Sequence, residues 1–232
     1  MTILQAMHLT KTFVGGDGGL LTVLDDVSME VAQGEMVAIV GASGAGKSTL
    51  LHLLGALDRP TRGQVAIGGV ALDGLDDETL AALRNKKVGF VFQFHHLLRE
   101  FSALENVMIP LRIAGWTDGA AQQRATELIE RVGLGARMSH RPSELSGGEQ
   151  QRTAVARALA VDPAVLLADE PSGNLDHANA ERLHDLFETL SRDLEIAMVI
   201  VTHNRSLASR ADRVLLLEDG KLVESNVGEA VP

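Results

Sequence analysis

The chain contains no cysteine, only 3% of its residues are aromatic, and glycine and proline number 23 and 6 among 232 residues. Without cysteine there is no disulfide, no thiolate nucleophile and no cysteine-ligated metal site. The longest apolar run, with glycine counted, extends only from Val65 to Leu72, whereas a membrane-spanning helix needs about 20 residues. Glycine and proline are too few for a collagen-like or low-complexity chain. With these classes excluded, the length and composition indicate a globular domain with a full hydrophobic core.

The amino terminus lacks the apolar core of a signal peptide, so we expect a soluble, cytoplasmic chain. Basic residues are also in deficit, because 21 lysines and arginines face 31 aspartates and glutamates, giving a net charge of −10. The densest basic stretch, Arg84–Lys87, is too short for a polybasic membrane anchor. Since a nucleic-acid binder normally has a basic face, we expect no nucleic-acid partner.

Four continuous apolar segments, rich in β-branched residues, indicate strands that are buried on both faces. They are Met36–Val40, Lys87–Phe92, Ala164–Ala168 and Ala197–Val201. Because they alternate with helical patterns, we predict an α/β fold with a parallel core sheet flanked by helices. The alternating residues 27–31 indicate a half-buried strand of an antiparallel β subdomain. Asp219-Gly220 favours a hairpin turn between strands at 213–218 and 221–224.

Helical patterns fill most of the segment between the second and third of these buried strands. Ser102–Glu105 and Ser146–Glu149 both match the capping box S-x-x-E that begins helices. Thr117 is a candidate N-cap of another helix, which would end at Gly133. The apolar positions of that helix are Ala121, Ala125, Leu128, Ile129 and Val132. We therefore predict an inserted α-helical subdomain over about residues 95–160, within a single domain of residues 1–232.

A later helix is indicated by an apolar stripe at spacings of three and four residues. The stripe consists of Leu183, Leu186, Phe187 and Leu190. The tail Ser225–Pro232 is expected to be frayed.

Residues Gly41–Ser48 (GASGAGKS) fit the phosphate-binding pattern G-x-x-x-x-G-K-[ST]. The pattern follows a buried strand and precedes a helical run, as it requires, which disfavours a glycine-rich turn that binds nothing. Glycines let backbone N–H groups surround phosphate oxygens, and the helix N-terminus adds partial positive charge. Lys47 should reach the β- and γ-phosphates of ATP, and Ser48 should ligate Mg²⁺. The predicted nucleotide-binding residues here are Gly41, Ser43, Gly44, Ala45, Gly46, Lys47, Ser48 and Thr49.

Two carboxylates, Asp169 and Glu170, end the third buried strand. In open α/β sheets the ligand lies beyond the carboxyl ends of the strands. We therefore expect Asp169 to hold Mg²⁺ and Glu170 to polarise the attacking water. By itself Asp-Glu before Pro171 is ordinary turn chemistry; the preceding phosphate-binding pattern makes the catalytic interpretation the better one.

The segment Leu145–Arg152 (LSGGEQQR) resembles the LSGGQ signature of ATP-binding-cassette (ABC) ATPases, with Glu149 where glutamine is commonest. It lies between the phosphate-binding pattern and the acidic strand end, which is the family's order. The resemblance implies the ABC type of P-loop fold, an ATPase, and a head-to-tail homodimer. In that dimer the signature of one copy covers the ATP of the other. The signature residues implied to contact ATP are Ser146, Gly147, Gly148 and Glu149.

Other family elements follow in order and extend the resemblance from about Leu9 to Val223. Phe13 stands where the family stacks an aromatic, usually tyrosine, on adenine, and Gln93 stands where a glutamine senses Mg²⁺. In Ser172–Asp176 (SGNLD), Asp176 is the implied nucleotide-contacting acid, and Ser172 stands where threonine is commoner. His203 matches the histidine that contacts the γ-phosphate. The resemblance thus implies Glu170, His203 and Gln93 as catalytic residues and Ser48, Gln93 and Asp169 as metal ligands.

Several stretches, among them Gln93–Leu98 (QFHHLL) and Phe101–Val107 (FSALENV), are similar to the lipoprotein-releasing LolD group of this family. That similarity implies ATP-driven release of lipoproteins from the bacterial inner membrane, from a peripheral position on its cytoplasmic face. It implies two integral membrane subunits of LolC/LolE type as partners, with lipoprotein cargo bound only indirectly. Macrolide-export and cell-division cassettes are close alternatives.

The same residues disfavour three other classes of protein. A non-transport ABC ATPase acting on DNA or ribosomes is disfavoured by the net charge and by the absence of a coiled-coil insertion. A small-molecule P-loop kinase would not explain Ser146–Arg152 or His203. A purely regulatory nucleotide binder would need neither Glu170 nor His203.

Overall fold

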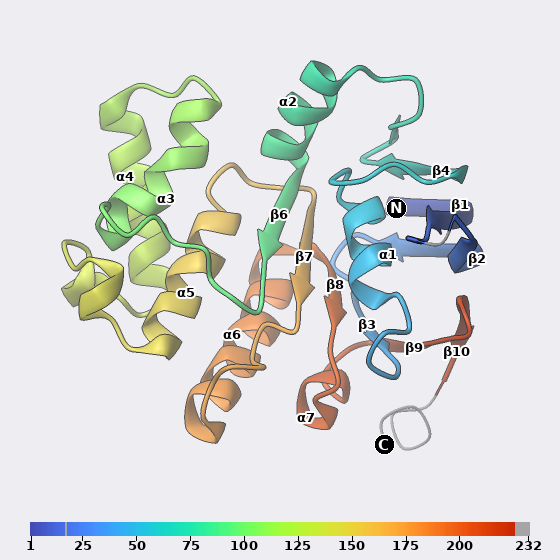
Figure 1. The fold of residues 1–232 in the computed structure, drawn as a ribbon. Helices are drawn as coiled ribbons and strands as arrows, with labels where there is room; N and C mark the ends of the chain where they lie inside the picture. Colours follow the sequence, from blue (N-terminus) through green and yellow to red (C-terminus); the bar gives the residue numbers. More distant parts are fainter. Residues whose placement is uncertain (17, 226–232) are drawn as a thin grey trace.

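The computed structural model describes residues 1–16 and 18–225 and contains two sheets (Figure 1). The antiparallel sheet has the order β2-β1-β4-β5, with β1 Thr2–Val14, β2 Leu20–Ala32, β4 Arg62–Ile67 and β5 Val70–Ala71. The second sheet has the order β10-β9-β3-β8-β7-β6. Its strands are β3 Met36–Val40, β6 Val88–Val91, β7 Val165–Asp169, β8 Ala197–Val201, β9 Arg213–Glu218 and β10 Lys221–Glu224. Apart from Ser225, the tail expected to be frayed lies outside the described residues.

The helices are α1 Lys47–Leu54, α2 Asp77–Lys87, α3 Ala103–Ile113, α4 Asp118–Arg131, α5 Gly147–Ala158, α6 His177–Leu194 and α7 Arg205–Ala208. Short 3-10 turns, η1 Gly135–Arg137 and η2 Pro142–Glu144, precede α5. Among the residues that the structure describes, no helix has both the length and the apolar character needed to cross a membrane.

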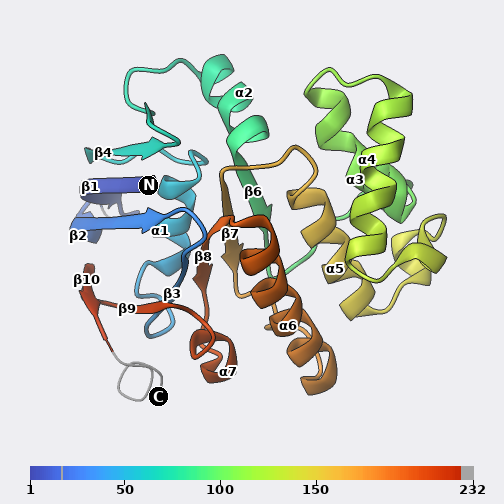
Figure 2. The same ribbon diagram turned by 180° about the vertical axis from the view of Figure 1, so that it is seen from behind.

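Both faces of the parallel strands are buried, but against different layers. In β7, Leu166 and Ala168 join the apolar cluster formed with α3, α4, α5 and α6, whereas Val165 and Leu167 join the cluster formed with α1 and the antiparallel sheet. Because successive strand residues point to opposite faces, each face needs its own apolar side chains. Helix α1 therefore lies between the two sheets, and the helical insertion lies on the other side (Figures 1 and 2).

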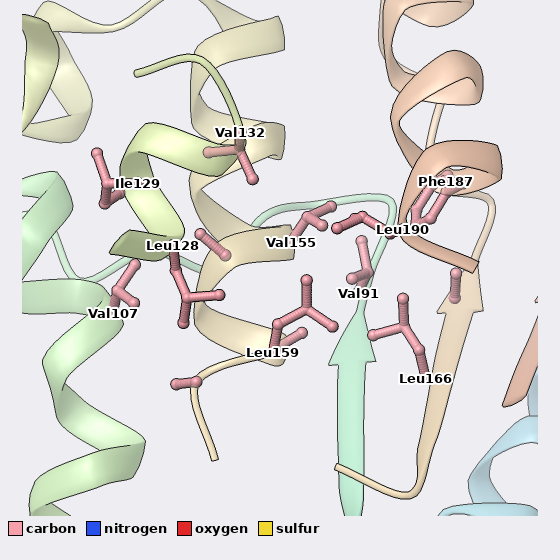
Figure 3. Close-up of a cluster of buried hydrophobic side chains, with 14 of the residues drawn as sticks. Val91, Val107, Leu128, Ile129, Val132, Val155, Leu159, Leu166, Phe187 and Leu190 are labelled. Atoms are coloured by element: carbon pink, nitrogen blue, oxygen red, sulfur yellow. The ribbon is translucent and has the colours of Figure 1, made fainter. Parts of the chain in front are cut away.

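Helix α5 joins the helical insertion to the sheet. Val155 of α5 and Leu159, the C-cap residue of that helix, lie between side chains of α3 and α4 on one side and of β6 and β7 on the other (Figure 3). The helix approaches β6 closely, since a Cβ atom on Gly89 would lie 2.5 Å from the carbonyl oxygen of Ala158. Because Gly89 has no side chain, the end of α5 can pack directly against β6.

A buried asparagine fixes the loop that leads from β6 to α3. The Asn106 amide oxygen accepts a hydrogen bond from the Leu98 N–H at 2.8 Å. Its amide nitrogen donates to the carbonyl oxygens of Leu98, Phe101 and Ser102 at 3.1, 3.1 and 2.9 Å. The side chain thus accepts one hydrogen bond and shares its two amide hydrogens among three carbonyl oxygens, which satisfies backbone groups that this irregular segment leaves without ladder partners.

The predicted architecture is confirmed: a parallel core sheet flanked by helices, an antiparallel sheet and an inserted helical segment. The capping boxes at Ser102 and Ser146 are formed, and the hairpin turn has positive φ at Asp219 and Gly220. Thr117 is the N-cap residue of α4, but its side chain makes no capping hydrogen bond. Strands β1 and β4 and helix α2 were not among the predicted elements.

We expect Gly89→Ala to lower the free energy of unfolding by about 1–3 kcal/mol, because the new methyl group forces α5 away from β6. Urea unfolding followed by circular dichroism measures this. Gly119→Ala in α4 is the matched control, since its Cβ would meet nothing within 4 Å, and it should change stability by less than about 1 kcal/mol. Equal midpoints for the two variants would contradict the close approach of α5.

Candidate functional site

Four parallel strands end at one edge of the sheet, and the segments that follow them form a hollow. The strands are adjacent in the order β3-β8-β7-β6, so their carboxyl ends lie side by side. The hollow has a volume of about 500 Å³. It is lined by Val23, Ser43, Gly44, Gly46, Lys47, Ser48, Thr49, Gln93, Asp169, Glu170, Val201 and His203. The fold thus brings residues of four separate predicted motifs into one site.

The loop after β3 depends on glycine at both of its ends. Gly46, the N-cap residue of α1, has φ 99°, and a Cβ there would lie 2.8 Å from Val23 Cγ1. A Cβ on Gly41 would lie 2.3 Å from the carbonyl oxygen of Leu217. Lys47 begins α1, and its ammonium donates hydrogen bonds to the Gly41 and Ala42 carbonyl oxygens at 2.8 and 2.9 Å. A cation and the N-terminus of α1 therefore both face the hollow, which suits an anion.

Asp169, the last residue of β7, lies within hydrogen-bonding reach of Ser48, and both residues line the hollow. Burial raises the pKa of Asp169, and the neighbouring Glu170 carboxylate raises it further. A hydrogen bond with Ser48 and the charge of Lys47 act in the opposite direction. A cation bound in the hollow would stabilise the ionised form of this carboxylate.

Glu170 is held in place by His203. Its Oε1 atom lies 2.8 Å from His203 Nδ1, and its Oε2 atom accepts a hydrogen bond from the His203 backbone N–H at 3.2 Å. The backbone N–H of Glu170 donates to the carbonyl oxygen of Val201 at 2.9 Å. Glu170 has φ 45°, a left-handed conformation that is strained for a residue with a side chain. The Glu170 side chain is 17% exposed, so it remains accessible from the hollow.

Gln93, just beyond β6, also lines the hollow. Its amide nitrogen donates a hydrogen bond to Asn174 Oδ1 at 3.2 Å, and Asn174 Nδ2 donates to the Gln93 carbonyl oxygen at 3.2 Å. The buried Gln151 of α5 donates to the carbonyl oxygen of Phe92 at 2.8 Å. Gln93 is thereby tied to the loop after Glu170 and, through its neighbour, to the helix that follows the predicted signature.

The predicted signature residues and Asp176 do not line the hollow. Ser146 is the N-cap of α5, and Glu149 completes the capping box by accepting from the Ser146 N–H and Oγ–H, both at 2.8 Å. Asp176 is the N-cap of α6 and accepts from the Asn179 N–H at 2.9 Å. The two helix starts touch, since a Cβ on Gly148 would lie 2.6 Å from Asn179 Oδ1. The signature and Asp176 therefore lie together at the adjoining N-termini of α5 and α6, outside the hollow.

Phe13, near the end of β1, does not line the hollow either. Its side chain is 42% exposed, and the Lys11 ammonium lies 5.0 Å from the centroid of its ring. Gly41 and Ala45 belong to the phosphate-binding loop without contributing to the lining.

Three residues around the hollow were missed from the sequence. Val23 and Val201 line it, and Asn174 holds Gln93. Val201 ends a predicted strand, so its place at the sheet edge was a usable signal. Val23 and Asn174 reach the site only through contacts between distant segments, which no local pattern encodes.

The residues present fit a magnesium nucleotide. The described residues contain no group of three His, Cys, Asp or Glu side chains that could hold a metal. Magnesium, however, is typically bound by one or two carboxylates together with phosphates. Ser48, Gln93 and Asp169 offer hydroxyl, amide and carboxylate oxygens on the walls of the same hollow. The glycine-lined loop and Lys47 supply the complementary surface for phosphate.

Comparisons with known proteins agree with this geometry. The family described as "ABC transporter" matches residues 24–173. The lipoprotein-releasing system ATP-binding protein LolD of Geobacter metallireducens is 52% identical over 222 residues, which cover 96% of this chain and 98% of that protein. The protein of the same name from Bordetella pertussis is 54% identical over 219 residues, covering 94% of each chain.

Solved structures of ABC cassettes share the fold. The dimeric structure of MJ0796, a bacterial ABC transporter cassette, aligns with a TM-score of 0.88 and 37% identity over 97% of this chain and 99% of that one. A dimeric post-hydrolysis state of MJ0796 bound to ADP and Pi also aligns with a TM-score of 0.88, at 36% identity. Because the family matches more than half of the sequence and these relatives align along nearly all of it, the chain belongs to the ABC transporter family and is an ATPase cassette of that family.

Proposed function

We propose that this chain is the ATPase subunit of a transporter that releases lipoproteins from the bacterial inner membrane. The observation that carries the proposal is the 52–54% identity to lipoprotein-releasing ATP-binding proteins over 94–96% of the chain. In this proposal residues 1–232 form a single ATP-binding domain, which lies peripherally on the cytoplasmic face of the membrane.

The hollow at the ends of β3, β6, β7 and β8 is the ATP site. The loop 41–46 surrounds the phosphates with backbone N–H groups, and Lys47 moves its ammonium from the loop carbonyls to phosphate oxygens. Ser48, Thr49, Gln93 and Asp169 are the groups that hold Mg²⁺ and the phosphates. When bound, Mg²⁺ neutralises charge on the phosphate oxygens during phosphoryl transfer.

Glu170 is the general base. Its carboxylate accepts a proton from the attacking water, and His203 holds one carboxylate oxygen at 2.8 Å. With Nδ1 of His203 engaged by Glu170, Nε2 is the ring nitrogen left for the γ-phosphate. Gln93, which is hydrogen-bonded to Asn174, couples the presence of nucleotide in the site to the conformation of the loop that follows β6.

A second copy of the chain completes the site. Ser146–Glu149 and Asp176 lie outside the hollow of their own chain, so they contact ATP only if another copy presents them. One surface that carries both half-sites pairs with itself about a two-fold axis. Phe13, which is partly exposed, stacks on the adenine in this proposal.

The membrane subunits, proposed to be of LolC/LolE type, dock on an apolar groove between α2, β6, α3 and α5. The groove has a volume of about 390 Å³, and Leu57, Phe90 and Ile113 are among its lining residues. Arg157 fixes the adjoining loop by donating to the carbonyl oxygens of His95 and His96, each at 2.8 Å. An apolar groove beside a fixed loop suits an amphipathic helix of the partner. The lipoprotein itself contacts only the membrane subunits.

Replacing Lys47 by alanine should lower ATP turnover at least about 100-fold and weaken ATP binding, because a charged donor to the phosphates is lost. Phosphate release and equilibrium binding of a fluorescent ATP analogue measure the two effects. Lys86→Ala, at an exposed position of α2, is the matched control and should leave both unchanged. Turnover in Lys47→Ala equal to that of the control would contradict the assignment of the site.

Glu170→Gln should lower ATP turnover by about 10²–10⁴-fold, because the amide cannot accept the proton. ATP should then trap the variant as a dimer, which light scattering after gel filtration detects. Glu188→Gln, on α6, is the control of equal charge change and should retain both turnover and the wild-type elution. If Glu170→Gln stays monomeric with ATP and Mg²⁺, the paired-cassette mechanism is wrong.

Tagged Glu170→Gln protein with ATP should recover two related membrane subunits with large periplasmic domains, together with lipoproteins, from detergent-solubilised membranes. Mass spectrometry identifies them. Phe94→Asp, at a residue that is 64% exposed and two positions after Phe92 of the groove lining, should reduce this recovery about tenfold, whereas Val70→Asp on β5 should not. Recovery of an unrelated permease, or of a macrolide-export or cell-division subunit, would keep the ATPase mechanism and discard the lipoprotein cargo.

A further inference from the structure

A buried histidine lies behind the catalytic loop and contacts it directly. His184 of α6 is 0% exposed, and its Nε2 atom lies 3.0 Å from Ser172 Oγ. Ser172 is 6% exposed and lies two residues after Glu170. The turn between them is closed by a hydrogen bond from the Gly173 N–H to the Glu170 carbonyl oxygen at 3.0 Å. His184 thus holds the segment that carries Glu170 from the side opposite the hollow.

The charges around His184 determine whether its Nε2 atom donates or accepts the hydrogen bond with Ser172. Burial lowers the pKa of His184, so the imidazole is neutral, with one N–H. Its Nδ1 atom lies 3.3 Å from Glu181 Oε1, an electrostatic contact rather than an aligned hydrogen bond. Since a carboxylate only accepts, the hydrogen is favoured on Nδ1. Nε2 is then an acceptor, and the Ser172 hydroxyl donates to it.

The same glutamate connects this contact to the segment after His203. Glu181 Oε1 accepts a hydrogen bond from Ser206 Oγ at 2.8 Å, and Glu181 Oε2 lies 2.8 Å from Arg210 Nη2. Ser206 belongs to α7, which begins just beyond His203 and lies beside α6 (Figure 2). A continuous set of polar contacts therefore runs behind the site, from the Glu170 segment through α6 to the His203 segment.

We propose that His184 is a positioning residue for ATP hydrolysis: through Ser172 and Glu181 it fixes the segments that carry Glu170 and His203 relative to each other. The inference rests on the proposed function, in which these two side chains act on the attacking water and the γ-phosphate. Their contact of 2.8 Å spans two separate loops, and Glu170 sits in a strained left-handed conformation. Both features require support from the surrounding structure.

The serine is a tether and not a nucleophile. Ser, His and Glu in contact also form the triad of many hydrolases. Ser172, however, is buried and does not line the hollow, so no substrate atom reaches its hydroxyl.

The test compares Ser172→Ala, His184→Phe and the double variant. Each should lower kcat for ATP hydrolysis about tenfold by misplacing the base, while KM and the affinity for a fluorescent ATP analogue change less than about twofold. Because both residues act through one contact, the double variant should be no slower than about the slower single variant. His184→Gln, whose amide oxygen can accept from Ser172, should recover most of kcat. Ser191→Ala, another buried serine of this region whose Oγ donates to the Gly34 carbonyl oxygen, should leave kcat unchanged.

A second measurement uses the nucleotide-free protein. Amide hydrogen exchange at Gly173 and Leu175, whose N–H groups bond to the Glu170 and Ser172 carbonyl oxygens, should accelerate roughly tenfold in His184→Phe and Ser172→Ala. Exchange in α4, far from this contact, should stay unchanged.

The outcomes separate this inference from the proposed function. Faster exchange at the loop together with lower kcat and an unchanged KM supports the positioning role. If the wild-type chain hydrolyses ATP and kcat is the same in both variants, or if the loop amides exchange as in the wild type, the positioning role is overturned alone. A wild-type chain that does not hydrolyse ATP overturns the proposed function and the positioning role with it.

Discussion

The site depends on the register of four parallel strands. Val201 of β8 pairs with Ile39 of β3 on one side and with Asp169 of β7 on the other, while Val91 of β6 pairs with Ala168. All four strands therefore end at one level, and the residues that follow them meet across the hollow. A slip by one residue would exchange the two faces of a strand. Here it would also move Asp169 or the segment of His203 out of line with Lys47.

That register is maintained because both faces of the strands are packed against different layers. The odd-numbered residues of β7 face α1 and the antiparallel sheet, and the even-numbered ones face α5 and α6. A slipped strand would have to fit two different apolar surfaces at once. The closeness of α5 to β6 at Gly89 adds a steric constraint. The helix that begins with the signature is thus held against the strand that ends next to Gln93.

The sequence predicted the buried strands well, since continuous segments of β-branched residues such as Met36–Val40 are typical of strands that are buried on both faces. It did not predict α2, where Leu80 is the buried residue, so that the helix carries almost no apolar stripe. Strand β1 was missed because its pairing with β2 shifts register at several points and His8 has φ 52°. These irregularities break the alternation on which strand prediction relies.

For the candidate site, motifs identified the residues that follow the four strands, because each motif is local. The contacts that hold those residues in place could not be predicted from the sequence. Ser172 and His184 are separated by 12 positions, and Gln93 and Asn174 by 81. Their meeting depends on how α6 and β6 pack, and a single buried histidine in a helix is usually structural. For Glu149, by contrast, the local sequence predicted the contact itself, since the capping box with Ser146 is formed. Hydrogen bonds from the Ser146 backbone and hydroxyl lower the pKa of Glu149, and its ATP contact remains a prediction for the nucleotide of a second copy. The carboxylate turns back onto the helix start, 3.4 Å from Arg137 Nε. The Arg137 guanidinium offsets part of the negative charge that Glu149 places at the start of α5, where the proposed dimer would bring the phosphates of the other copy's ATP.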